Sequence, residues 1–557
     1  MRKILIVGGV AGGASVAARL RRLSETDEII MFEKDEYISF ANCGLPYYIG
    51  GVIQDRNKLF VQTVKGMGKR FAIDIRVFNE VVSINRAEKT VQVKNRQTGE
   101  KYQESYDILI LSPGASPFVP PIEGLASAQN VYTLRNIPDT DKIKAAVEKG
   151  AKTAVVIGGG FIGVEMAENL CEAGIKATLV EKAATIMPAP FDAELSALLI
   201  SEMRHHGVDV LTESEVVSFQ DEGRMVVLKD GRTLPADLVV LAIGVVPNTR
   251  LAQEAGLAIG QRRGIVVDEH FATSDPSIFA VGDAIEIPHA VTREQTYIPL
   301  AWPANRQGRI LADHLNGRPI RYKGTLGSNV AKVFNLVAAS TGLTETGARS
   351  RGLPVDSIIV HRGNHAGYYP NPTDIALKLV FHPESGLIYG AQAVGGEGTE
   401  KRIDVIAAAM VGKMTVADLP DLEVCYAPPF SSAKDPVNIA GYAADNVVSD
   451  GMHTVKYDQI DELVAAGYVL YDVRTAEEFA RGHIQGAILL PLDELRDRLA
   501  ELPQDVQQTI YVNCQVGQRG YLAQQILRHH GYQNVFNLSG GYKTYKGFYG
   551  QAPNGLG

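Results

Sequence analysis

The chain has 557 residues, of which 45% are hydrophobic and 21% are charged, values that are usual for a globular protein of three or four domains. Its formal net charge of −8 argues against a nucleic-acid-binding protein, because phosphate recognition favours a basic surface. The sequence contains no apolar run of the roughly 18 residues that a membrane helix needs, no signal-peptide pattern and only four scattered cysteines, so we expect a cytoplasmic location.

The N-terminal segment has the pattern of a dinucleotide-binding βαβ unit. Residues 3–8 predict a strand, a glycine-rich turn and a helix through Leu23 follow, and a second strand ends at Glu33. The glycines let the backbone approach a pyrophosphate at the helix N-terminus, and the terminal carboxylate accepts a hydrogen bond from a ribose hydroxyl. Val10 replaces the second glycine of GxGxxG, so either the pyrophosphate is approached differently or Gly9 takes over. The predicted cofactor contacts here are Gly8, Gly9, Ala11, Gly12, Gly13, Glu33 and Lys34.

The helix of this unit carries a polar stripe. Ser15, Arg19 and Arg22 are spaced by four and three residues and therefore share one helical face. Two arginines on one face can clamp an anionic ligand. The alternative is an ordinary solvated basic face.

Cys43 follows the first unit with no second cysteine nearby. A redox disulfide needs a partner within roughly 7 Å between Cα atoms, and a short sequence spacing usually indicates that partner. Any disulfide partner of Cys43 is therefore expected to come from a small molecule. The alternative is a buried, inert cysteine, and we expect Cys171 to lie in the core and Cys425 to be structural.

Residues 153–181 repeat the dinucleotide-binding pattern, with all three glycines of GxGxxG in place and Glu181 at the end of the second strand. This carboxylate would accept from a free 2′-hydroxyl and repel a 2′-phosphate, which favours NADH and leaves NADPH open. The alternative is a second βαβ unit that serves only packing. The predicted contacts are Gly158, Gly160, Phe161, Ile162, Gly163 and Glu181.

Three further apolar strands, in residues 106–116, 237–247 and 273–283, run into turns, and the last one ends in Gly282-Asp283. The array from residue 1 to about residue 445 resembles the flavoprotein disulfide reductases that contain two dinucleotide-binding domains. The resemblance implies that Asp283 binds the ribityl chain of FAD. It also implies that Pro299 and Ala301, at the start of a helix through about Asn316, face the flavin. The mixed pattern from about residue 323 to residue 442 resembles the dimerisation domain of that family.

Within this family, Ser39-Phe40-Ala41-Asn42-Cys43-Gly44 resembles coenzyme A disulfide reductases and the related NADH oxidases and persulfide reductases, which have a single redox cysteine. The resemblance implies a homodimer with shared active sites, in which two tyrosines and a basic residue of the partner subunit reach the cysteine. The tyrosines are Tyr426 and either Tyr368 or its neighbour Tyr369, with Tyr368 the prediction, and the basic residue is Lys434. The implied coenzyme A contacts are Ser15, Arg19, Arg22, Ser39, Asn42 and Lys434.

Residues from about 451 to 550 closely resemble a rhodanese domain. A strand at residues 510–513 leads to Cys514, and a loop and a helix over about 520–530 follow. Backbone N–H groups of such a loop lower a thiol pKa and stabilise a persulfide anion, and Arg519 would add positive charge. The alternative is an inactive rhodanese-like module used for docking.

The predicted fold class is α/β, with two Rossmann-like dinucleotide-binding domains, an α+β dimerisation domain and a C-terminal α/β rhodanese domain. The predicted bounds are residues 1–116 and 250–322 for FAD, 117–249 for NAD(P)H, 323–446 for dimerisation and 447–557 for the rhodanese. The favoured function is NADH-dependent reduction of coenzyme A persulfide or polysulfide with release of sulfide, because a fused sulfur carrier is superfluous for a symmetric disulfide. Coenzyme A disulfide reduction and a sulfur-carrier or redox-sensing role stay open. An NADH oxidase would cycle Cys43 through sulfenic acid and has no use for Arg19 and Arg22.

Overall fold

The structure is a computed structural model and describes residues 1–550. It contains two compact units. The first consists of residues 1–182 and 207–327, and the second consists of residues 183–206 and the described residues from 328 onward. Within residues 1–550, no helix is long and apolar enough to cross a membrane.

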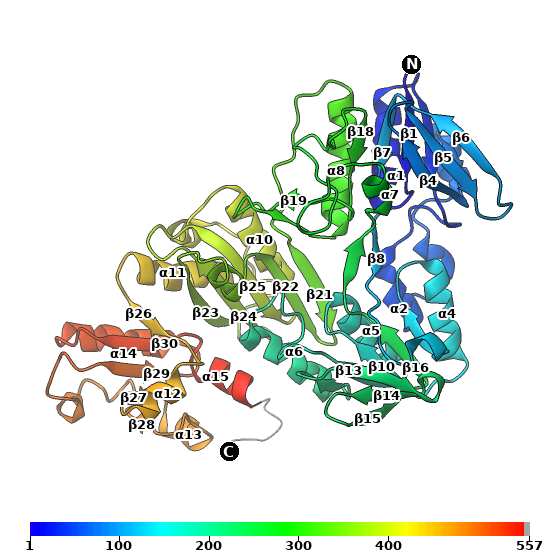
Figure 1. The fold of residues 1–557 in the computed structure, drawn as a ribbon. Coiled ribbons are helices and arrows are strands. Elements are labelled where there is room, and N and C mark those ends of the chain that lie inside the picture. Colours follow the sequence, from blue (N-terminus) through cyan, green and yellow to red (C-terminus); the bar gives the residue numbers. More distant parts are fainter. Residues whose placement is uncertain (551–557) are drawn as a thin grey trace. The chain divides into compact units, whose positions relative to one another are not determined.

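The first sheet of the first unit is parallel, with the strand order β18-β7-β1-β2-β3. The apolar strand at the N-terminus forms its centre, and Ile4, Leu5 and Ile6 are fully buried. Helices α1 and α8 pack against each other beside this sheet (Figure 1). The bounds are β1 Lys3–Val7, α1 Ala11–Leu23, β2 Glu28–Phe32, β3 Asp74–Arg76, β7 Ile108–Leu111, β18 Ile278–Ala280 and α8 Ala301–Leu315.

The second sheet of this unit is also parallel, with the order β12-β11-β10-β16-β9. Each sheet has the predicted strand at its centre, followed by the predicted glycine turn and helix, so the prediction of two Rossmann-like domains is confirmed. The bounds are β9 Val131–Thr133, β10 Thr153–Ile157, α5 Phe161–Glu172, β11 Lys176–Val180, β12 Asp209–Leu211 and β16 Leu238–Leu241. The unit also contains two three-stranded antiparallel sheets, formed by β4 Asn79–Asn85, β5 Thr90–Asn95 and β6 Lys101–Ser105, and by β13 Val216–Gln220, β14 Met225–Leu228 and β15 Thr233–Pro235.

The second unit contains an antiparallel sheet with the order β21-β22-β25-β24-β23. Helices α10 and α11 pack against it, and β23 is an edge strand. Helix α6 also belongs to this unit, although in sequence it lies between β11 and β12. The bounds are α6 Ala193–His205, β21 Asn329–Val333, β22 Leu336–Gly342, α9 Glu345–Arg349, β23 Asp356–Gly363, β24 Asp374–Phe381, β25 Ile388–Gly395, α10 Thr399–Val411 and α11 Pro436–Val448.

A second sheet of this unit, formed by the C-terminal residues, is parallel, with the order β26-β30-β29-β27-β28. The predicted strand before Cys514 is its central strand β29, and the predicted helix after the loop is α14. The bounds are β26 His453–Val455, β27 Val469–Asp472, β28 Ile488–Leu489, β29 Ile510–Asn513, α14 Gln518–His529, β30 Val535–Leu538 and α15 Gly541–Tyr549. The α/β fold class predicted from the sequence is therefore confirmed.

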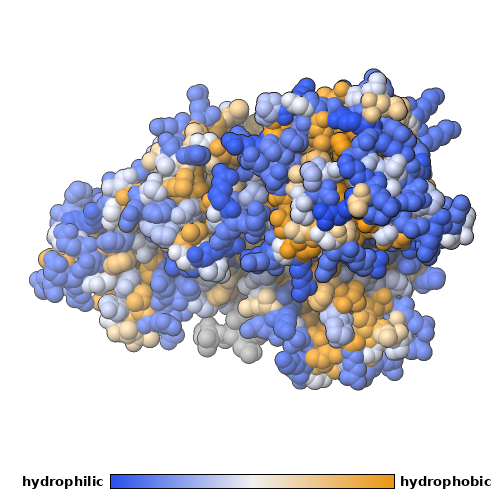
Figure 2. Space-filling model, turned by 45° about the horizontal axis from the view of Figure 1, so that its top comes forward, coloured by the Kyte–Doolittle hydropathy of each residue, from blue (hydrophilic) through white to orange (hydrophobic). Residues whose placement is uncertain are grey.

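Large hydrophobic side chains are also found at the surface. Figure 2 shows a face on which hydrophilic residues lie between separate hydrophobic patches. Across the described residues, the most exposed aromatic side chains are Trp302, Tyr368 and Phe430, with 74%, 77% and 71% of their surface accessible. Exposed aromatic side chains of this kind are typical of surfaces that bind a partner.

Candidate active site

The first glycine turn joins β1 to α1 and has the geometry of a pyrophosphate cradle. The Gly9 N–H donates to the Glu33 carboxylate at 2.9 Å, so this acid lies at the turn as predicted. Burial raises the pKa of Glu33, which shows that the carboxylate is withdrawn from water. A Cβ at Gly13 would lie 1.9 Å from the Gly8 oxygen, so the close packing of turn and helix requires glycine there. Val10 has a φ of −96°, so this position does not need the positive φ that favours glycine.

Asp283 lies in the first unit just after β18 and forms no hydrogen bond with a described residue. Burial raises its pKa, and Arg135 partly offsets that effect. The nearby Tyr297 hydroxyl is buried and has no hydrogen-bond partner within residues 1–550, and burial and Asp283 raise its pKa. A buried carboxylate and a buried phenol without partners fit a polar ligand such as the ribityl chain of FAD. The sequence predicted Asp283, but Arg135 and Tyr297 carry no motif of their own and were missed.

The remaining residues that the sequence predicts to contact FAD lie in the same unit, at three places. Ala11 and Gly12 open α1, Lys34 is exposed directly after Glu33, and Pro299 and Ala301 lie at the start of α8.

The second glycine turn repeats the geometry of the first. The Gly159 N–H donates to Glu181 at 2.6 Å, and Gly158 has a φ of +106°. A Cβ at Gly163 would lie 1.8 Å from a backbone oxygen of the turn, whereas a Cβ at Gly160 would meet no atom within 4 Å. The space beside Gly160 is open at the N-terminus of α5, where Phe161 and Ile162 are half-buried. This turn therefore also fits a dinucleotide.

Cys43 lies in the short 3-10 helix η1 Asn42–Gly44, which precedes α2 Leu45–Ile49. Its side chain is exposed, so it is not an inert core cysteine. Partial burial raises the pKa of the Cys43 thiol, and the negative charges of Glu165 and Asp283 raise it further. The thiol therefore lies close to α5 of the second glycine unit and to the acid that follows β18 of the first sheet.

Glu165 is a candidate that the sequence reasoning missed. Burial and the neighbouring Glu168 raise its pKa to about 7, which gives a carboxyl near Cys43 that exchanges a proton at neutral pH. Its signal in the sequence was an acidic residue in the first half of the helix that follows the second glycine turn. Asn42, beside the cysteine, lies against Arg135, and Ser39 has a φ of +43°.

The polar stripe on α1 is only partly free. Arg19 forms an ion pair with the buried Asp313 at 2.6 Å, and the Ser15 hydroxyl donates to Asn305 at 2.5 Å. Arg22 is exposed. In this structure Asp313 of α8 neutralises Arg19, so Arg22 is the arginine of the stripe that is exposed.

Tyr368 and Tyr426, in the second unit, are brought together from loops 58 positions apart in sequence. Their hydroxyls are hydrogen bonded at 2.9 Å, which raises the pKa of Tyr368, and both side chains are exposed. Tyr369 instead packs edge-on against His365, so Tyr368 is the one that pairs with Tyr426. Lys434 is exposed, with its ammonium 5.8 Å from the ring centre of Tyr442.

Cys514 follows β29 and is completely buried, and its sulfur accepts a hydrogen bond from Gly517 N–H at 3.1 Å. One loop N–H is thus directed at the sulfur, whereas the predicted cradle consists of several N–H groups. Arg519 donates two hydrogen bonds of 2.7 Å to Glu478, which lowers the pKa of that carboxyl to about 2. The charge that Arg519 adds near the sulfur is therefore offset by Glu478, a partner 41 positions away.

The other two cysteines do not match the expectation of core or structural residues, because Cys171 is half-buried and Cys425 is exposed.

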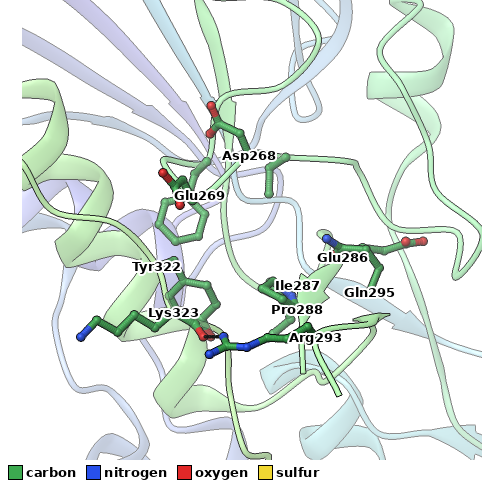
Figure 3. A pocket seen from close by; sticks show the side chains of 11 residues that line it. Asp268, Glu269, Glu286, Ile287, Pro288, Arg293, Gln295, Tyr322 and Lys323 are labelled. Atoms are coloured by element: carbon green, nitrogen blue, oxygen red, sulfur yellow. Dashed lines mark hydrogen bonds between the residues drawn. The ribbon is translucent and has the colours of Figure 1, made fainter. Parts of the chain in front are cut away.

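A pocket of about 280 Å³ in the first unit is lined by charged residues that include Glu286, Arg293 and Lys323 (Figure 3). Arg293 donates to the backbone oxygen of Lys323 at 2.9 Å. None of the predicted site residues lines this pocket.

Known protein families match most of the chain. Residues 2–308 match the pyridine nucleotide-disulphide oxidoreductase family, and residues 329–436 match its dimerisation domain. Residues 456–547 match the rhodanese-like domain.

Individual proteins also match over most of their length. Coenzyme A disulfide reductase of Staphylococcus epidermidis is 37% identical over 447 residues, which are 80% of this chain and 100% of that protein. The structure of reduced Bacillus anthracis CoADR-RHD is 56% identical, with a TM-score of 0.97 over 99% of this chain and 98% of that one. The structure of an NAD-dependent persulfide reductase from A. fulgidus is 36% identical, with a TM-score of 0.91 over 98% of this chain and 100% of that one.

Proposed function

Since the chain belongs to the pyridine nucleotide-disulphide oxidoreductase family, we propose that it is an FAD enzyme that uses NADH to reduce coenzyme A persulfide or polysulfide through Cys43. The observation that carries the proposal is the position of Cys43. Its exposed thiol lies near Glu165 of the second glycine unit and near Asp283 of the first sheet. A thiol close to two dinucleotide units can receive electrons from one ligand through the other.

The residues present fit both cofactors. The first glycine turn, Glu33, Asp283 and Tyr297 would hold FAD, and the second glycine turn with Glu181 would hold NADH. Bound FAD would supply the transfer of two electrons from NADH to a disulfide of Cys43. Glu181 already accepts from a backbone N–H, and its negative charge disfavours the 2′-phosphate of NADPH.

The chemistry of Cys43 is thiol–disulfide exchange. The Cys43 thiolate attacks the coenzyme A sulfur of the persulfide, the mixed disulfide forms, and hydrosulfide leaves with the electron pair of the broken bond. Overall, NADH, one proton and coenzyme A persulfide become NAD⁺, coenzyme A and hydrogen sulfide. The raised pKa of Cys43 means that the free thiol is protonated at neutral pH, so another group must accept its proton, and we assign this role to Glu165, whose charge acts on the thiol and whose own pKa is raised to about 7.

Recognition of coenzyme A is assigned to the residues that the family resemblance indicates, which are Ser15, Arg19, Arg22, Ser39, Asn42 and Lys434. Of the two arginines, Arg22 is the one exposed to a ligand, and Arg19 with Asp313 orients the helix face that carries Ser15. Polysulfide, a chain of sulfur without the coenzyme A moiety, would use Cys43 alone.

The proposed functional state is a homodimer in which Tyr368 and Tyr426 of one subunit donate a proton at Cys43 of the other. The match to the dimerisation domain and the exposure of the hydrogen-bonded tyrosine pair support this arrangement. We propose no nucleic-acid or membrane partner. A cytoplasmic location and the domain bounds predicted from the sequence belong to the same proposal, and the four free cysteines are compatible with a reducing compartment.

The rhodanese domain would carry sulfane sulfur as a persulfide on Cys514, and this favours persulfide and polysulfide over a symmetric disulfide as substrate. The hydrogen bond from Gly517 to the sulfur supports an anionic persulfide there.

The test is NADH oxidation without oxygen, with coenzyme A persulfide, polysulfide and coenzyme A disulfide in turn. The variants are Cys43→Ser and Cys514→Ser, with Cys171→Ser as the matched control because that cysteine has no proposed role. We expect persulfide to turn over fastest and Cys43→Ser to abolish turnover, while Cys171→Ser retains it. The rate of Cys514→Ser then reports which substrates need the rhodanese.

Coenzyme A disulfide reduction is the second candidate, and the identity to coenzyme A disulfide reductases over 80% of the chain favours it. If only the symmetric disulfide turns over and Cys514→Ser changes nothing, this second candidate is correct. If no small persulfide or disulfide supports NADH turnover, a sulfur-carrier or redox-sensing role replaces both.

A further inference from the structure

In the second unit, the C-terminal domain is hydrogen bonded to the edge strand of the antiparallel sheet. The Ile359 N–H of the edge strand β23 donates to the Ser539 hydroxyl at 2.9 Å. Two residues along the strand, His361 hydrogen bonds to Thr544 of α15 at 2.8 Å. Both contacts are buried, so they satisfy polar groups that an edge strand would otherwise leave to water.

The same segment of α15 also holds the loop of Cys514. The Tyr542 N–H donates to the backbone oxygen of Cys514 at 2.8 Å, and the Lys543 N–H donates to that of Gln515 at 3.0 Å. The carbonyl groups of the loop are thereby tied to the first turn of α15. The N-terminal part of α15 consequently contacts both the cysteine loop and strand β23, so residues of β23 lie next to the loop.

Arg362 is the residue of β23 that contacts the loop directly. Its guanidinium donates to the side-chain oxygen of Gln518 at 3.0 Å. Gln518 directly follows Gly517, whose N–H donates to the Cys514 sulfur, and its side chain is exposed. A cation of the antiparallel sheet therefore lies against Gln518, the residue next to the loop N–H that binds the Cys514 sulfur.

Two other cations near this contact are neutralised. Lys543 pairs with Asp374. Arg519, in the first turn of α14, pairs with Glu478. Arg362, by contrast, has no carboxylate within ion-pair distance in the described part of the chain, although it is half-buried and loss of hydration lowers its pKa. A partly dehydrated cation without a counter-ion gains free energy when an anion binds next to it.

We propose that Arg362 is an anion-binding residue of the Cys514 site, so that this site extends onto the dimerisation domain and selects sulfur donors and acceptors that carry negative charge. The ligand class is a small or extended anion with a transferable sulfur, such as a persulfide anion or a thiosulfonate. The inference rests on the proposed role of Cys514 as a sulfur carrier. It goes further because it assigns part of the binding site to a strand outside the rhodanese domain.

Thiosulfate is the probe for this site. The Cys514 thiolate forms a bond to the outer sulfur of thiosulfate, the bond from that sulfur to the sulfite group breaks, and sulfite leaves with the electron pair. The product is Cys514 persulfide, which transfers its outer sulfur to cyanide as thiocyanate and regenerates the thiolate. The measured quantity is kcat/KM for thiosulfate, because it reports the step in which the anion binds and reacts.

The full chain is compared with Arg362→Gln, which keeps a polar side chain, and with Arg362→Lys, which keeps the charge. Arg496→Gln is the matched control, because Arg496 is an exposed arginine of the C-terminal domain that contains Cys514. We expect kcat/KM for thiosulfate to fall about fivefold in Arg362→Gln, which corresponds to about 1 kcal/mol, and to recover in Arg362→Lys. NADH oxidation with coenzyme A disulfide should stay at the wild-type rate in all of them, which shows that the variants are folded.

A second readout does not depend on a sulfur donor. The alkylation rate of Cys514, followed by mass spectrometry of its peptide, is measured with anionic iodoacetate and with neutral iodoacetamide. The ratio of the iodoacetate rate to the iodoacetamide rate should fall in Arg362→Gln and stay unchanged in Arg496→Gln. Equal effects of Arg362→Gln and Arg496→Gln in both readouts would overturn the inference while leaving the proposed function intact. Absence of Cys514-dependent sulfur transfer in the wild type would overturn both this inference and the sulfur-carrier role of Cys514 on which it rests.

Discussion

Lys378 is the most consequential buried charge of the second unit, and its replacement by methionine gives the sharpest test of how that unit is held together. Its ammonium lies 2.9 Å from Asp192, 2.5 Å from Glu194 and 2.9 Å from Glu345. The three acids come from the start of α6 and from α9, and the lysine comes from β24. Tyr457 of the C-terminal domain also reaches Glu194 at 3.3 Å, so this cluster joins three parts of the unit.

The expected loss in the free energy of unfolding follows from the groups that the substitution leaves without a partner. Methionine keeps the volume of the lysine stem but removes the charge, so three buried carboxylates lose their common cation. Removing one partner of a buried ion pair costs about 3–5 kcal/mol. For a unit of this size, about 1 kcal/mol lowers the unfolding midpoint by roughly 2–4 °C, so we expect a decrease of roughly 6–20 °C at pH 7.5.

The stability difference between wild type and Lys378→Met should also depend on pH. In the wild type, Lys378 lowers the pKa of Asp192 and of Glu345, so their stabilisation is fully present above the unfolded values near pH 4 and is lost only as the pH falls below them. In Lys378→Met, burial without the cation raises these pKa values, so the folded variant takes up protons more readily than the unfolded chain. The difference between wild type and variant should therefore shrink as the pH is lowered from 8 to 5.5.

The assay is thermal unfolding of the full chain, followed by circular dichroism across that pH range. Lys229→Met is the matched control, because Lys229 pairs with Glu215 at the surface with 73% of its side chain exposed, and such exposed pairs contribute little to stability. A midpoint for Lys378→Met within the range of the control, or a difference that is constant with pH, would refute this account of the cluster.

Three further predictions concern the candidate active site. Glu181→Arg should raise the ratio of kcat/KM for NADPH to that for NADH at least about tenfold, because it exchanges a repulsive charge for an attractive one; an unchanged ratio would contradict the assignment. Gly163→Ala should lower NADH affinity, and it should lower stability by about 1–3 kcal/mol, since its Cβ would lie 1.8 Å from a backbone oxygen. The control Gly160→Ala should leave stability unchanged in a melting assay. Equal melting temperatures of the two variants would show that the turn relaxes to admit the Cβ. Tyr368→Phe should lower kcat for persulfide about 10²-fold and Tyr369→Phe should not, and the reverse order would assign the proton donor to the other tyrosine.

The sequence by itself determined the parts of the fold that are written in local patterns. The glycine turns at Gly8 and Gly158, the acids Glu33 and Glu181 and the strand before Cys514 all lie where their spacing predicted. These features are readable because a βαβ unit is built from neighbouring residues, and because its tight turn admits only glycine at defined positions. The family resemblance extended this to the dimerisation and rhodanese domains.

The tertiary structure decided which charged and polar groups are actually available. Arg19 and Arg519 both have motif positions, yet Asp313 pairs with the first across 294 positions of sequence and Glu478 pairs with the second. Conversely, Arg362 has no motif, and only its contact with Gln518 across 156 positions indicates a role. A local pattern fixes a residue's type and the side of the helix or strand that it occupies. Its counter-ion and its burial depend on chain segments distant in sequence, so only the folded structure reveals them.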